Sequence, residues 1–203
     1  MNANKYGGLF VAFDGPNGVG KSTLIEHVKY ELSNRGLEAF VTKEPSNTQL
    51  GYFTRQIAEH LDGKSLACLV AADRYHHLKE TVIPQLRAGS IVITDRYVLS
   101  SLILQCMDNV ETEFVLALND QVIAPDIQVA VKANVSVLQA RLNERSQLTR
   151  FERGQRSFEE LRFMDLGIAA LRERDVNILE IDNSGNLSEN VSLIIEQILA
   201  VRL

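Results

Sequence analysis

Short apolar runs alternate with longer amphipathic stretches along most of the chain. Residues 9–13 form a continuous apolar run that ends at Asp14-Gly15. Such a run is expected of a strand that is buried on both faces of a sheet. Four later runs have similar length and character, so strands are also predicted over residues 39–42, 91–94, 127–131 and 176–181.

The stretches between these runs have helical spacing. The first, residues 20–35, carries the apolar residues Leu24, Ile25 and Val28 and stops at Gly36, a residue that suits the end of a helix. Further helices are predicted over about 51–61, 66–86 (with a kink or break at Pro84), 135–145, 158–174 and 187–201. Strands that alternate with helices predict an α/β fold in which a parallel sheet is covered on both faces.

The composition is that of a globular protein with one core. The 203 residues are 45 % hydrophobic and 23 % charged, and no linker, repeat or low-complexity segment divides them, so a single domain over residues 1–203 is expected. The net charge of −5 argues against a nucleic acid polymer as partner. Residues 1–8 are polar and no apolar run approaches the ~20 residues of a membrane span, so we expect a cytoplasmic protein with no membrane partner.

The segment from Gly15 to Ser22 fits the phosphate-binding pattern G-x-x-x-x-G-K-[ST] and is called the P-loop below. It follows a buried strand and opens a helix, so its backbone N–H groups and the helix dipole are predicted to hold the phosphates of ATP. Lys21 is predicted to bridge the β- and γ-phosphates, and the Ser22 hydroxyl to ligate Mg²⁺. The predicted ATP-binding residues are Gly15, Pro16, Asn17, Gly18, Val19, Gly20, Lys21, Ser22 and Thr23.

Charged residues follow the predicted strands at the ends where parallel sheets bind ligands. Asp95 ends the third strand and is predicted to hold Mg²⁺, directly or through water. Arg96 comes next, Lys43 ends the second strand, and Arg74 lies in Ala-Asp-Arg. Cations that converge on one edge of the sheet indicate an acceptor that is itself anionic, and arginine offers a fork to a phosphate.

A basic stretch breaks the alternation between residues 145 and 157. It carries Arg145, Arg150, Arg153 and Arg156. On composition alone such a stretch is more often a solvated face than a site, and both interpretations stay open at this point.

These segments together resemble the thymidylate kinase (dTMP kinase) family over essentially the whole chain, in order and in spacing. The matching segments are Phe13-Asp14-Gly15 through Lys21-Ser22-Thr23, Thr42-Lys43-Glu44-Pro45-Ser46, Leu50-Gly51 with Arg55, Ala71-Ala72-Asp73-Arg74, Asp95-Arg96-Tyr97 with Ser100, Pro125-Asp126, and Arg150-Phe151-Glu152.

The resemblance implies a P-loop kinase fold with a five-stranded parallel sheet covered by helices on both faces, and a homodimer. It also implies the reaction ATP + dTMP → ADP + dTDP with Mg²⁺, and it turns residues 145–157 into a short lid over ATP. The P-loop itself offers no arginine, so the resemblance is to the bacterial-type branch, in which the lid supplies that cation. The implied catalytic residues are Lys21, Arg96 and Arg150, with Arg145 and Arg153 behind Arg150. The implied acceptor-binding residues are Asn17, Lys43, Glu44, Arg55, Val70, Arg74, Arg96, Ser101, Leu104 and Gln105.

Several acceptor-side positions depart from the family's pattern. Asn17 stands where a carboxylate is usual, Val70 where a phenylalanine stacks on thymine, and Leu104 where a tyrosine lies near the sugar. Lys43 replaces an arginine. These changes raise the hypothesis of a kinase whose acceptor is a different nucleotide-like molecule.

Three other classes compete with a monophosphate kinase. A signalling GTPase would need an N-K-x-D motif, which the sequence lacks. A non-catalytic ATP-binding relative is suggested by the uncharged Asn17. A deoxynucleoside kinase would need a base near a free 5′-hydroxyl, for which Glu44 is the candidate, but the phosphate-directed cations argue against it.

Overall fold

A parallel five-stranded sheet forms the centre of the computed structural model, which describes residues 1–154 and 156–202. Residue 155 of the predicted lid and residue 203 of the predicted domain lie outside the described residues. The strand order is β2-β3-β1-β4-β5, so the predicted fold class is confirmed. The strands are β1 (Leu9–Asp14), β2 (Ala39–Lys43), β3 (Ile91–Asp95), β4 (Ile127–Lys132) and β5 (Ile178–Asp182).

Helices fill the connections between the strands, close to the predicted bounds. They are α1 (Lys21–Asn34), α2 (Gln49–Ile57), α3 (Gly63–His77), the π-helical turn η1 (Leu78–Val82), α4 (Ile83–Arg87), α5 (Val98–Met107), α6 (Thr112–Leu118), α7 (Val135–Asn143), α8 (Ser157–Arg172) and α9 (Leu187–Arg202). The start of α2 is earlier than predicted because the Thr48 hydroxyl accepts a hydrogen bond from the Gly51 N–H and caps the helix.

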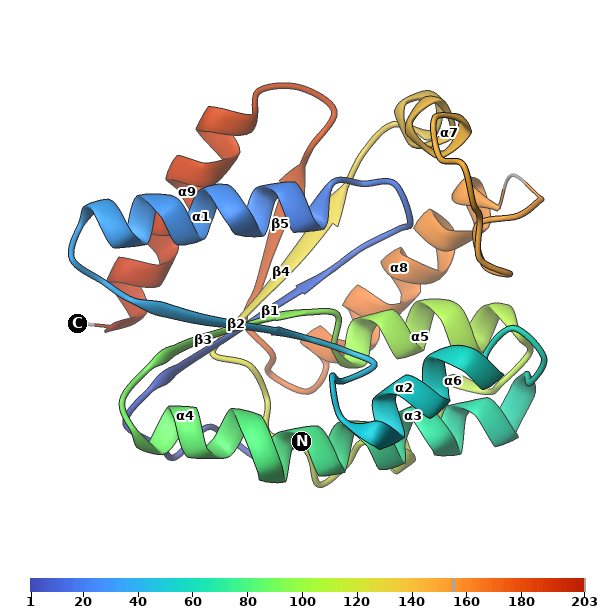
Figure 1. Ribbon diagram of the computed structural model, residues 1–203, viewed down its shortest axis with the longest axis horizontal. Coiled ribbons are helices and arrows are strands. Elements are labelled where there is room, and N and C mark those ends of the chain that lie inside the picture. The colour runs from blue at the N-terminus through green and yellow to red at the C-terminus, as the bar shows by residue number, and fades with distance from the viewer. Residues whose placement is uncertain (155, 203) are drawn as a thin grey trace.

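The sheet has a hydrophobic core on each face. Helices α1 and α9 cover one face, and α3, α4, α5 and α8 lie on the other (Figure 1). Strand β1 shows why a continuous apolar run was needed: Phe10 and Ala12 point into one core, while Val11 and Phe13 point into the other. Each large side chain buried in this way stabilises the fold by about 1.5–3 kcal/mol.

The long helical region before β3 changes its winding near Pro84. Proline lacks an N–H and its ring crowds the preceding turn, so a regular α-helix cannot pass through it unchanged. The structure places the change one turn earlier than Pro84, in the π-helical turn η1, and the α-helix resumes at Ile83.

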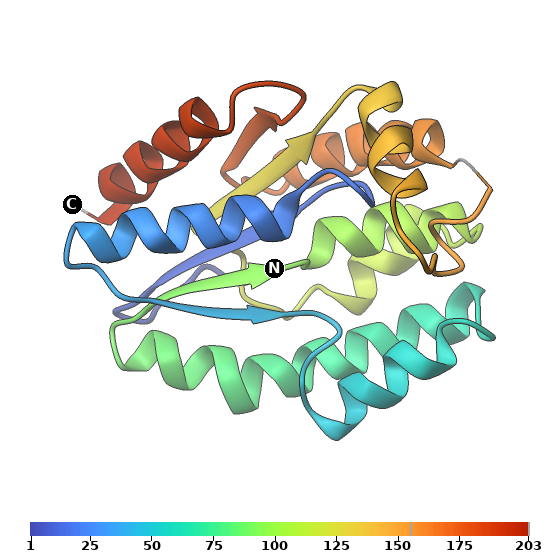
Figure 2. The ribbon, with the colours of Figure 1, turned by 45° about the horizontal axis from the view of Figure 1, so that its top comes forward.

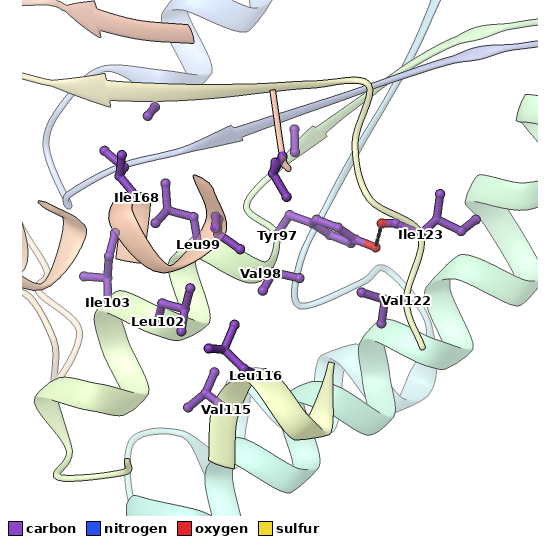
Figure 3. Packing of buried hydrophobic residues seen from close by; sticks show 14 of the residues in the cluster. Tyr97, Val98, Leu99, Leu102, Ile103, Val115, Leu116, Val122, Ile123 and Ile168 are labelled. Atoms are coloured by element: carbon purple, nitrogen blue, oxygen red, sulfur yellow. Dashed lines mark hydrogen bonds between the residues drawn. The ribbon is translucent and has the colours of Figure 1, made fainter. Parts of the chain in front are cut away.

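The turn that joins β3 to α5 is fixed by the residue after Arg96. The Tyr97 ring is fully buried and meets the ring of Phe10 edge to face, with centroids 5.1 Å apart. Its hydroxyl donates to the Ile123 carbonyl over 2.7 Å, inside the cluster drawn in Figure 3. Asp14 Oδ1 accepts from the backbone N–H groups of Tyr97 (2.8 Å) and Ser100 (3.0 Å). This anchoring holds Arg96 at a φ of 79°, an unfavourable value for a residue with a side chain.

Several loops and helices gather at the carboxyl ends of the strands. Figure 2 shows α2, α7 and the segment between α7 and α8 at that end of the sheet. The candidate site described next lies among them. Among the described residues, no helix combines the length and the apolar character that crossing a membrane would require.

Candidate active site

The P-loop passes so close to β4 that only glycine fits at its start. A Cβ atom on Gly15 would lie 2.2 Å from the Val131 carbonyl oxygen. Gly20, at the other end of the loop, has a φ of 91° and stands immediately before α1. The loop therefore curls into the N-terminus of α1, the geometry that favours an anion.

Lys21 extends back along the P-loop. Its ammonium group donates to the carbonyl oxygens of Gly15 (2.9 Å) and Pro16 (3.0 Å). Burial, reinforced by the positive charge of Arg96, lowers the pKa of Lys21 from 10.5 to about 7, against the opposing effect of nearby carboxylates. An anion beside this amine would restore its proton, so the group is suited to bind phosphate.

Ser22 and Asp95 meet beside the P-loop. The Ser22 hydroxyl donates to Asp95 Oδ2 over 2.9 Å. The other carboxylate oxygen, Asp95 Oδ1, is buried and has no hydrogen-bond partner among the described residues. A hydroxyl and an unpaired carboxylate oxygen are hard oxygen donors, so the pair fits Mg²⁺. The described residues contain no group of three or more His, Cys, Asp or Glu arranged to hold a metal ion.

The P-loop is hydrogen-bonded to the acceptor side through Asn17. Arg96 Nη2 donates to Asn17 Oδ1 over 2.7 Å, and Arg96 Nη1 donates to the Ser100 hydroxyl over 3.2 Å. Glu160, on α8, accepts from both the backbone N–H (2.6 Å) and the side-chain Nδ2 (2.7 Å) of Asn17. Burial raises the pKa of Glu160, in opposition to its two hydrogen bonds from Asn17. Arg96 thus presents a cation directly beside the donor-phosphate loop.

Arg74 forms the buried floor of the site. Its guanidinium donates to Glu44 Oε2 (2.7 Å), Asn119 Oδ1 (2.6 Å) and the Ser101 hydroxyl (3.0 Å). The second oxygen of Glu44 lies 3.2 Å from His77 Nδ1. Glu44 therefore holds Arg74 and the His77 ring in place at the base of the cleft.

One cleft of about 440 Å³ joins these groups. Most of the predicted site residues line it, from the P-loop to the acceptor side. They are Asn17, Gly18, Gly20, Lys21, Ser22, Thr23, Glu44, Arg55, Val70, Arg74, Asp95, Arg96, Ser101, Leu104, Gln105 and Arg145. Gly15, Pro16 and Val19 are buried within the loop itself.

Three predicted cations do not line the cleft in this structure: Lys43, Arg150 and Arg153. Side chains alternate along β2 and the residues after it, so Thr42 and Glu44 are buried while Lys43 is exposed. Arg150 donates to both oxygens of Asp108 (2.8 and 2.7 Å) and to the Ala58 carbonyl oxygen (2.8 Å).

Two arginines of the segment between α7 and α8 bind residues near the ends of α2 and α5. Arg150 binds Asp108 at the end of α5, and Arg153 pairs with Glu59 just beyond α2. Arg145 pairs instead with Glu152, which also accepts from the Thr149 N–H over 2.8 Å. Arg145 is thus the arginine of this segment that lines the cleft.

Two residues that shape the site were not predicted from the sequence as functional residues. Asp14 marks only the end of a strand in the sequence, although in the structure it fixes the turn that carries Arg96. Glu160 has a signal in the sequence: it occupies the same stripe of α8 as the buried Met164, Ile168 and Leu171. A glutamate on the apolar face of a helix needs a polar partner, which here is Asn17.

Comparison with known proteins gives one consistent family. The family model for thymidylate kinase matches residues 13–194. A probable thymidylate kinase of Caldivirga maquilingensis is 38 % identical over 149 residues, which cover 71 % of this chain and 73 % of the relative. The thymidylate kinase of Caldicellulosiruptor saccharolyticus is 36 % identical, with 66 % of this chain and 69 % of the relative covered. A probable thymidylate kinase of Thermococcus gammatolerans is 32 % identical, with 72 % and 76 % covered.

Proposed function

This chain belongs to the thymidylate kinase family, and from that premise we propose that it transfers the γ-phosphoryl group of ATP to dTMP, giving ADP and dTDP. One observation carries the proposal: Arg96, a cation suited to an acceptor phosphate, is hydrogen-bonded to the P-loop that would hold the donor phosphates. The two reacting phosphates would therefore meet within a single cleft.

The donor side is assigned to the P-loop. Its backbone and Lys21 would bind the phosphates of ATP, and Ser22 and Asp95 would hold Mg²⁺. When bound, the ion would supply positive charge that neutralises the phosphates of ATP. Lys21 would take up a proton as it exchanges two carbonyl partners for phosphate oxygens.

On the acceptor side Arg96 would hold the attacking phosphate in line with the γ-phosphorus. A phosphate monoester oxygen is already ionised near neutral pH, so no general base is needed. The catalytic contribution of the chain is therefore positioning together with charge stabilisation.

For the lid we propose that residues 145–157 close over ATP and that Arg145 supplies the cation that stabilises the transferred phosphoryl group. The sequence favoured Arg150 for that task. The contacts support another division, because Arg145 lines the cleft while the Arg150 guanidinium is engaged with Asp108 and backbone carbonyls. Arg150 would then hold the lid down.

The far end of the cleft would receive the thymine base. Leu66, Val70 and Leu104 supply apolar walls, and Arg74 and Gln105 supply polar groups. Gln105 Oε1 is buried without a hydrogen-bond partner among the described residues, so it can accept from a ring N–H. An apolar slot with a few polar groups is typical of a small-molecule site.

The test is an ADP-release assay with ATP and Mg²⁺ across dTMP, dUMP, other nucleoside monophosphates and sugar phosphates. Turnover should be fastest with dTMP, and Lys21→Ala should abolish it. Fast turnover with another acceptor and none with dTMP would instead favour a kinase whose acceptor is a different nucleotide-like molecule. ATP binding without ADP release on any acceptor would overturn the proposal.

The family also leads us to propose a homodimer that works in the cytoplasm. Light scattering after size-exclusion chromatography should give a mass near twice the 22.7 kDa of one chain. A mass of one chain at micromolar concentration would contradict the dimer.

A further inference from the structure

Glu160 is a buried carboxylate whose two oxygens both face one residue of the P-loop. Its exposed fraction is 2 %, and it lies in the first turn of α8, directly after the lid segment. One oxygen accepts from the Asn17 backbone N–H and the other from Asn17 Nδ2, at 2.6 and 2.7 Å. The carboxylate therefore accepts two hydrogen bonds from Asn17.

These two hydrogen bonds fix the orientation of the Asn17 side-chain amide. The two ends of an asparagine amide have nearly the same shape, but one end donates and the other accepts. An ionised carboxylate only accepts, so it holds the Nδ2 end, and Oδ1 is turned toward Arg96. Arginine only donates, so it is compatible with this orientation and no other.

Nothing in the packing of α8 requires a carboxylate at position 160. The stripe continues with the apolar residues Met164, Ile168 and Leu171, and an apolar side chain at position 160 would avoid the cost of burying a charge. The two hydrogen bonds offset part of that cost, but they serve the P-loop rather than the helix. Glu160 also brings a negative charge toward Lys21 and Arg96, which it influences electrostatically.

We propose that Glu160 is a positioning residue that orients the Asn17 amide, and that Asn17 in turn holds Arg96 in place for the acceptor phosphate. The inference rests on the proposed function only for the identity of the acceptor. It assigns Glu160 to the acceptor half of the reaction, since its contact with the Asn17 side-chain amide leads to Arg96.

The test exchanges the charge and the amide between the two positions. Asn17→Asp places two carboxylates against each other. Glu160→Gln replaces one accepting oxygen by an NH₂ group, which then faces a donor of Asn17, either its backbone N–H or its Nδ2. Each single variant should lower kcat/KM for dTMP by about tenfold to a hundredfold, with little change in ATP affinity. The double variant Asn17→Asp with Glu160→Gln restores complementary partners, because the amide introduced on α8 donates to the new carboxylate and accepts from the backbone N–H. It should recover to within about threefold of the original enzyme.

Controls separate this proposal from a loss of folding and from a failure of the proposed function. Glu173→Gln, at an exposed position just beyond α8, should leave kcat/KM unchanged. Thermal unfolding identifies any variant that fails to fold, and calorimetric titration with dTMP follows the acceptor site without turnover. If the unmodified enzyme releases no ADP with dTMP, the proposed function fails, while the titration still tests whether the double variant recovers affinity. Folded single variants with unchanged dTMP affinity and turnover, or a folded double variant no better than the weaker single, would overturn the role of Glu160.

Discussion

Arg96 donates a hydrogen bond to Asn17 across 2.7 Å, and this contact joins the end of β3 to the phosphate-binding loop. Arg96 has the backbone φ of 79° described above, held by the buried Tyr97 and by Asp14. Strained residues of this kind persist where the surrounding structure fixes them, and they are often found at functional sites. The sharp turn brings a cation to the P-loop that a relaxed strand-to-helix connection would direct elsewhere.

The first prediction concerns the two lid arginines. Arg145→Ala should lower kcat by at least about a hundredfold, because it removes the cation from the transferred phosphoryl group. Arg150→Ala should weaken ATP binding and lower kcat by roughly tenfold or less, because it releases the lid from Asp108. Steady-state kinetics of both variants separates the two roles. Asp108→Asn is the matched variant, because it weakens the same Arg150–Asp108 contact from the other side. Near-normal kcat in Arg145→Ala beside a hundredfold loss in Arg150→Ala would reverse the assignment.

The second prediction concerns pH. The pKa of Lys21 is lowered to about 7 in the free protein, so the amine loses its proton as the pH rises through 7, and ATP binding must restore it. The dissociation constant for ATP should therefore rise roughly tenfold between pH 7 and 8.5, with proton uptake on binding. Calorimetry in buffers of different ionisation enthalpy measures that uptake. Lys21→Arg keeps its charge throughout this range, so its affinity, although weaker, should not show the same slope.

The third prediction concerns the metal. Asp95→Asn removes the charge of the unpaired buried oxygen and should raise the Mg²⁺ concentration needed for half-maximal activity by about tenfold or more. The control is Asp165→Asn, which changes an exposed carboxylate on α8. It should leave the Mg²⁺ concentration needed for half-maximal activity unchanged. An unaltered Mg²⁺ titration in Asp95→Asn would remove this residue from the metal site.

The fourth prediction concerns stability. Tyr97→Phe keeps the buried ring but leaves the Ile123 carbonyl oxygen without its donor. We expect a loss of about 1–3 kcal/mol in the free energy of unfolding, measured by urea denaturation. Tyr30→Phe, at an exposed position, should change the free energy of unfolding by less than about 0.5 kcal/mol.

The strands and the P-loop could be predicted because their signals are local. The apolar run before Asp14 and the glycine spacing that follows it specify a buried strand, a tight loop and a helix without reference to the rest of the chain. The direction of Lys43 could not be predicted in the same way, because a shift of one residue in a strand turns a side chain to the other face.

Contacts between distant segments limited the prediction of the site. The sequence placed Arg150 in a lid but did not show that Asp108, 42 residues earlier, would bind it. The pairing of Glu160 with Asn17 spans 143 residues. Each of these pairs joins segments that only the folded chain brings together, which no local pattern specifies.

The most direct test of the central claim is to follow the phosphoryl group itself. The enzyme is incubated with Mg²⁺, dTMP and ATP labelled at the γ-phosphate, and the products are separated. Our account predicts that the label appears in the β-phosphate of dTDP in step with ADP formation, and that Arg96→Ala prevents this transfer. Label released only as inorganic phosphate, or retained in ATP while dTMP is present, would contradict the account.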